Sequence, residues 1–155
     1  ALARYQAAVR LMRLGHFNAG QQRAATEQQA GRAWLELAAS EHDPMRQRIL
    51  WSYLNYLTDS AWDRPAAAEL VVKAADDDRL HGWLRAMAAG KAAYDKAWRL
   101  RGGGYASEVD DDKWGAFFDA VAEAKTHFLT AYGLEPDHPE AAARGWDYLA
   151  GLYRD

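Results

Sequence analysis

The segment between Tyr94 and Trp114, YDKAWRLRGGGYASEVDDDKW, carries the side chains of this chain that are best suited to recognition chemistry. Trp98 and Arg101 are three residues apart, so on one helix they share a face, where the guanidinium can stack on the indole. Three glycines and then Tyr105 follow, and glycine permits a sharp reversal of the chain. Because arginine and aromatic side chains together are a frequent composition of binding hot spots, the segment predicts binding of a carboxylate or a peptide end.

Two interpretations of this segment stay open at the level of sequence. In the structural one, Arg101 pairs with an acid of the following loop, and Trp98 and Tyr105 belong to the core. In the functional one, the corner is a contact surface, Arg101 pairs with an anionic group of the partner, and the aromatic side chains supply the desolvated area. The partner-binding residues predicted by the functional interpretation are Trp98, Arg101, Tyr105, Glu108, Asp110, Asp111, Asp112 and Trp114.

The acidic run does not match a calcium-binding loop of the EF-hand type. Such a loop needs acids at positions 1, 3 and 5, glycine at position 6 and glutamate at position 12. Counted from Asp110, position 5 is Trp114 and position 12 is Val121; counted from Glu108, position 6 is Lys113. The five histidines show no H-x3-H or HExxH spacing, so a helical zinc pair is not predicted either.

Motifs for catalysis are equally missing from the sequence. It contains no G-x-S-x-G, no phosphate-binding Walker loop and no dinucleotide fingerprint, and the three glycines follow a predicted helix instead of a strand. There are no cysteines, which removes disulfides, thiolate zinc sites and cysteine nucleophiles together. We therefore predict no catalytic residue, no metal site and no cofactor, and a protein that is not an enzyme.

Length and composition predict one all-α domain over residues 1–155. The chain has 33 alanines against five valines and one isoleucine, and alanine favours helices whereas β-branched residues favour strands. No apolar stretch approaches the roughly 18 residues of a membrane span, so we expect no membrane partner. A cysteine-free chain is stable in the cytoplasm and in the periplasm; of the two we favour the cytoplasm.

The charge is unevenly distributed. The net charge is −3, but residues 1–103 sum to +4 and residues 104–155 to −7. An acidic last third speaks against a nucleic-acid binder, which concentrates basic residues on one face. The acidic end is either an ordinary solvated surface or the side that meets a basic partner.

Local start and stop signals predict the helices. Asp43-Pro44 and Asp63-Arg64-Pro65 each place a capping acid before a proline, which suits a helix N-terminus. Gly31 is expected to interrupt a helix that begins after Asn18, and Gly102–Gly104 to stop the long helix over residues 82–101. The predicted helices cover residues 2–14, 18–30, 32–40, 44–58, 65–75, 82–101, 112–132 and 139–153. Ile49, Leu50, Tyr53, Leu54 and Leu57 are predicted to face inward in the fourth helix, whereas Trp51 and Trp62 fall off the main apolar stripes.

Within AKTHFLTAYGLEPDHPEA, the residues Ala124, Phe128, Ala131 and Pro136 follow the spacing A-x3-F-x2-A-x4-P. This run resembles the second helix of a tetratricopeptide hairpin, in which small residues let two helices approach and the aromatic ring fills the groove. The resemblance implies an irregular stack of antiparallel helical hairpins that is tetratricopeptide-like at its C-terminal end.

The segment AW-x-x-RG-x-GY before this hairpin resembles a bacterial helical domain family of unknown function. The resemblance rests on Trp98, Arg101, Gly102, Gly104 and Tyr105. It implies a fold and a bacterial source, and it implies no activity.

These observations favour a non-enzymatic scaffold that binds a protein or a peptide. A specialised form of this hypothesis is an immunity or adaptor protein whose acidic end neutralises a basic partner. The alternatives are a small-ligand or enzymatic pocket at the Trp98–Trp114 corner and an oligomerisation module; the oligomeric state itself is not predicted.

Overall fold

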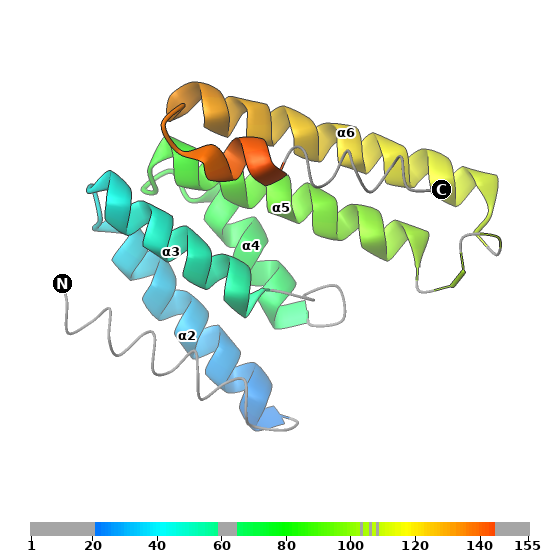
Figure 1. Cartoon of the computed structure of the whole chain (residues 1–155). Coiled ribbons are helices and arrows are strands. Elements are labelled where there is room, and N and C mark those ends of the chain that lie inside the picture. Colours follow the sequence, from blue (N-terminus) through cyan, green and yellow to red (C-terminus); the bar gives the residue numbers. More distant parts are fainter. Residues whose placement is uncertain (1–20, 59–64, 103, 106, 108, 145–155) are drawn as a thin grey trace.

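The computed structural model describes residues 21–58, 65–102, 104, 105, 107 and 109–144 (Figure 1). Within them lie the helices α2 (Gln21–Ala39), α3 (Pro44–Leu57), α4 (Pro65–Asp76), α5 (Gly82–Arg101) and α6 (Asp111–Leu134), and residues 139–144 are also helical. The described residues contain no strand, which confirms the predicted all-α class. The predicted helix 2–14, Asn18, Trp62, Asp63-Arg64 and residues 145–153 of the last predicted helix lie outside the described residues.

The described helices pack against one another, and α5 and α6 form an antiparallel pair (Figure 1). Figure 1 shows α5 and α6 running side by side in opposite directions, joined by the loop that follows Arg101. The most extensive contact of the described helices is the one between α5 and α6, followed by that between α4 and α5. Helix α4 also packs on α2, and α3 contacts both α2 and α5. The α5–α6 hairpin therefore forms one side of the molecule, with α6 at its edge.

Several helix ends follow from the capping chemistry that the sequence shows. The Asp43 side chain accepts a hydrogen bond of 3.0 Å from the backbone N–H of Arg46, and Pro44 is the first residue of α3, as predicted. Helix α4 begins at Pro65 and α5 covers the predicted range 82–101. Gly102 ends α5 with a φ of 81°, in the left-handed region that glycine adopts without strain.

The prediction that Gly31 breaks the helix is wrong, because α2 continues through this residue. Gly31 is buried and lies against α4: a Cβ atom at this position would lie 3.1 Å from Leu70 Cδ1. The missing side chain therefore allows α2 and α4 to pack closely. This packing explains why a poor helix former is retained inside α2.

The inward face of α3 differs from the predicted one at two residues. Leu50, Leu54 and Leu57 are buried as predicted, but Ile49 is exposed and Trp51 is buried. The core on this side is fixed by the buried Trp34 of α2, whose indole N–H donates to the carbonyl of Leu50 at 3.0 Å.

Close helix packing in the α5–α6 hairpin depends on small residues. Ala124 and Ala131 are fully buried, and the Phe128 ring between them lies against Gly90 of α5. A Cβ atom at Gly90 would be 2.7 Å from two carbon atoms of that ring, so the two helices approach as closely as a glycine allows. The run A-x3-F-x2-A thus lies at a helix–helix contact, and α6 ends at Leu134, before Pro136.

Among the described residues, no helix combines the length and the apolar character needed to cross a membrane.

Candidate partner-binding site

Arg101 occupies the centre of the corner where α5 ends and α6 begins. Its guanidinium carbon lies 5.3 Å from the ring centroid of Trp98 and 5.3 Å from that of Trp114, so the flat cation contacts both indoles. The Nη1 group also donates to the carbonyl oxygens of Gly102 and Gly104, each at 3.3 Å. Arg101 therefore ties the last turn of α5, the glycine loop and the first turn of α6 together.

Further aromatic rings extend this stack along the hairpin. Phe117 lies edge-on to both Trp98 and Trp114, with ring centroids 5.5 Å apart in each case. Trp114 stacks on Phe118 with centroids 5.6 Å apart and an interplanar angle of 22°. Phe117 belongs to a small core cluster, whereas Phe118 points to the surface and is 48% exposed. The cluster is thus anchored in the core on one side and open to solvent on the other.

The exposed part of the corner is aromatic. Tyr105 in the loop is 80% exposed and Trp98 is 40% exposed. Exposed aromatic rings on a rigid support are the residues that most often become hot spots when a partner desolvates them. The structural interpretation, which assigned Tyr105 to the core, is therefore wrong for this residue.

Carboxylates border this aromatic surface at the start of α6. Asp110 is the N-cap residue, although its side chain makes no capping hydrogen bond, and it pairs with Lys113 at 3.2 Å. Asp111 and Asp112 lie in the first turn and are exposed. Carboxylates in the first turn suit the positive end of the helix dipole, and these exposed side chains give the corner a negative border.

The structure brings most of the predicted residues to one corner. Trp98, Arg101 and Trp114 are in contact, Tyr105 and the three aspartates lie in the loop and first turn beside them, and Glu108 lies outside the described residues. Among the described residues, the hydrogen bonds of Arg101 go to backbone carbonyls instead of a carboxylate. Sequence reasoning missed Phe118, although its position four residues after Trp114 places the two rings on one helix face.

The described residues include no group of three or more histidine, aspartate or glutamate side chains that is arranged to hold a metal ion. Asp110, Asp111 and Asp112 are successive residues at a helix start, so they point in different directions around the axis.

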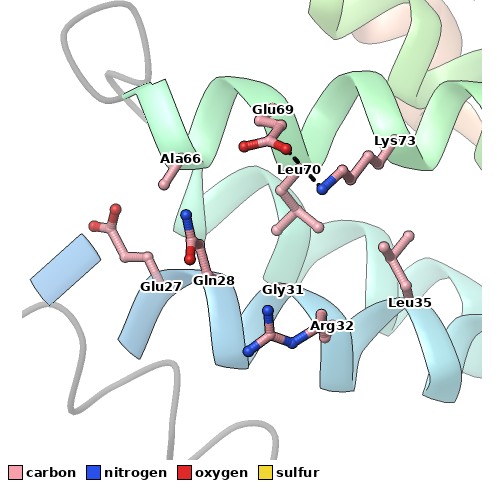
Figure 2. Close-up of a pocket in the computed structure, with 9 residues that line it drawn as sticks. All are labelled: Glu27, Gln28, Gly31, Arg32, Leu35, Ala66, Glu69, Leu70 and Lys73. Atoms are coloured by element: carbon pink, nitrogen blue, oxygen red, sulfur yellow. Dashed lines mark ion pairs between the residues drawn. The ribbon is translucent and has the colours of Figure 1, made fainter. Parts of the chain in front are cut away.

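A concave feature that the sequence did not predict lies between α2 and α4. It is a groove of about 190 Å³ lined by Gly31, Leu35, Ala66 and Leu70 at its base and by Glu27, Gln28, Arg32, Glu69 and Lys73 at its rim. Figure 2 shows Leu70 pointing from α4 toward Gly31, with the Glu69–Lys73 ion pair of 2.7 Å above it. The groove joins residues roughly 40 positions apart, which is why no local pattern reveals it.

In comparisons with known proteins, no family model matches the chain, and no match was found among the curated proteins or the solved structures. The fold and the corner define it as an all-α protein of packed helical hairpins with an aromatic and acidic surface at one end.

Proposed function

We propose that this protein is a non-enzymatic scaffold that binds a basic segment of a protein or peptide at the corner between α5 and α6. One observation carries the proposal: exposed aromatic rings are held by the Arg101 stack next to exposed carboxylates. A lysine or arginine side chain is complementary to both groups, because its cation is attracted to aromatic faces and to carboxylates.

Arg101 supports this surface from within. The guanidinium lies against the indoles of Trp98 and Trp114, and it donates to the carbonyl of Gly104, the residue before Tyr105. Arg101 therefore holds the Trp98 ring and the loop backbone beside Tyr105. A rigid surface loses less conformational entropy on binding, which raises affinity for the same contacts. We therefore assign Arg101 a positioning role, with Trp98 and Tyr105 as the contact residues and Asp110–Asp112 as the source of charge preference.

The acidic C-terminal third supports the same partner class. Residues 104–155 carry a charge of −7, so a basic partner is attracted to this end over a distance set by the Debye length. A tetratricopeptide-like hairpin that presents a surface to a protein is consistent with this role, and so is the more specialised role of an immunity or adaptor protein.

The experiment is a fluorescence-anisotropy titration of the full chain against two labelled synthetic peptides. Both have the same leucine and tryptophan positions, but one carries lysine where the other carries glutamate. We expect the lysine peptide to bind at least tenfold more tightly. Equal affinity for both peptides, or tighter binding of the glutamate peptide, would refute the proposed charge preference.

Matched variants locate the contact. Tyr105→Ala is expected to weaken binding about tenfold, as for a hot-spot side chain. Tyr56→Ala removes a similarly exposed ring from α3, on another helix, and is expected to leave binding unchanged. If the two variants weaken binding equally, the corner is not the contact site.

A further inference from the structure

The groove between α2 and α4 has an apolar base and a size that suits a small organic molecule. Its base consists of Gly31 and Leu35 of α2 and Ala66 and Leu70 of α4. Residues three or four positions apart share a helix face, so each helix turns one face to the groove. The groove measures about 190 Å³, which is more than the cavity of about 150 Å³ that holds one benzene molecule in another protein.

The absent side chain of Gly31 and the half-buried side chain of Leu35 leave apolar surface accessible in this groove. Figure 2 shows Leu70 pointing from α4 toward Gly31, and Leu70 is itself buried. An aliphatic chain laid on this base would remove apolar surface of both molecules from water, which favours binding.

The rim of the groove offers two hydrogen-bond donors that the described residues do not use. Lys73 is paired with Glu69 at 2.7 Å. Gln28 and Arg32 are exposed, and neither side chain makes an ion pair or a hydrogen bond with another described residue. Because they are four residues apart on α2, their side chains lie one turn apart on the same face. A guanidinium and an amide N–H group can therefore donate to one acceptor group.

The charges around the groove indicate where an anion would lie. Figure 2 shows Glu27 at one end of the groove and Leu35 at the other. Gln28 and Arg32 lie between them, so an anion on these two donors would direct its apolar part away from Glu27, toward Leu35. Residues 1–103, which include both helices, sum to +4, and a positive surrounding charge favours an anion.

We propose that the groove between α2 and α4 binds a small aliphatic carboxylate, with its carboxylate on Arg32 and Gln28 and its chain on Leu35 and Leu70. A guanidinium can donate two parallel hydrogen bonds to a carboxylate. A wholly polar anion would leave the apolar base uncovered, and a neutral hydrocarbon would leave the guanidinium without a partner. For one charged group and a short chain in a groove open to solvent, we expect a dissociation constant of about 1 mM.

A nuclear magnetic resonance titration of the isotope-labelled full chain tests the proposal with three probes. Hexanoate has the carboxylate and the chain, hexanamide has the chain without the charge, and acetate has the charge without the longer chain. We expect hexanoate to bind at least fivefold more tightly than either other probe. We also expect it to shift the backbone amide signals of Gly31 and Leu70 most strongly. Equal affinity for hexanamide or acetate, or the largest shifts outside α2 and α4, overturns the proposal.

Matched arginine variants test the cation. Arg32→Gln is expected to weaken hexanoate binding at least fivefold, because the charge and the paired donors are lost. Arg99→Gln removes the same charge from an exposed arginine in the last turn of α5 and should leave the affinity within twofold. Both side chains are exposed, so circular dichroism should show the helical fold unchanged. Equal weakening in the two variants would trace the effect to total charge and overturns the assignment of Arg32.

A second matched pair tests the position of the carboxylate along α2. Gln28→Glu places a negative charge beside it and is expected to weaken hexanoate binding at least fivefold at low salt. Gln29→Glu introduces the same charge at the exposed next residue, which lies about 100° further around the helix, and should change the affinity less than twofold. Wild-type affinity in Gln28→Glu, or equal weakening in both variants, overturns the proposed position.

Discussion

The contacts of Arg101 were only partly predictable from its position in the sequence. The spacing of Trp98 and Arg101 predicts a stack on one helix turn, and that contact is present at 5.3 Å. The second indole, from Trp114, comes from the far side of a loop, and so its contact depends on where α6 begins. The residue pair was therefore predictable from the sequence, whereas the three-membered stack was not.

The Asp77 side chain is expected to make the stability of the fold depend on pH. Its pKa is lowered from the ordinary value of 3.8, chiefly because the Arg79 guanidinium donates hydrogen bonds to the carboxylate at 2.9 and 2.7 Å. A carboxylate whose pKa is lower in the folded state stabilises the fold above its unfolded pKa. That contribution is lost as the pH falls through the folded pKa.

We therefore expect Asp77→Asn to lower the melting temperature slightly at pH 7 and to have no effect at pH 2. Thermal unfolding of both proteins from pH 2 to pH 7 measures the difference. Asp78→Asn, at the exposed neighbouring residue, controls for the loss of one negative charge. A difference that persists unchanged at pH 2 would show that the ion pair with Arg79 is not its cause.

At the scale of elements, the helices were predictable where local chemistry sets their ends. Asp43-Pro44 specifies the start of α3 because the cap and the proline act within one turn, and α5 begins and ends where its pattern predicts. Helix α6 begins at Asp111, one residue before its predicted start. Which side of a helix is buried depends on its neighbours, and this is why Ile49, Trp51 and Gly31 were misjudged.

Replacing glycine by alanine is expected to change the free energy of unfolding in opposite directions at Gly90 and at Gly133. Gly90→Ala is expected to destabilise the protein by about 1–3 kcal/mol, because its methyl group would overlap the buried ring of Phe128. Gly133→Ala meets open space and replaces a poor helix former, so we expect a gain of about 0.5–1 kcal/mol.

Urea unfolding monitored by circular dichroism measures both free energies of unfolding. If Gly90→Ala were as stable as the wild-type chain, α5 and α6 would not approach as closely as described.

At the scale of the whole molecule, the charge differs between the two parts of the sequence, with +4 over residues 1–103 and −7 over residues 104–155. The all-α class followed from composition, since alanine far outnumbers the β-branched residues. The groove between α2 and α4 did not follow from it, because a groove depends on which helix surfaces remain uncovered after packing. The sequence indicated which segment forms the corner. It did not indicate that the aromatic rings there would be exposed beside carboxylates.

The salt dependence of peptide binding tests the central claim most directly. It distinguishes electrostatic attraction to the aspartates from non-specific binding to the aromatic rings. We expect the affinity for the lysine peptide to fall at least tenfold between 50 and 500 mM NaCl. In an Asp110→Asn/Asp111→Asn/Asp112→Asn variant, we expect this dependence to be largely lost. Affinity that is independent of salt in the wild-type chain, or unchanged in the triple variant, would contradict a scaffold that selects basic partners at this corner.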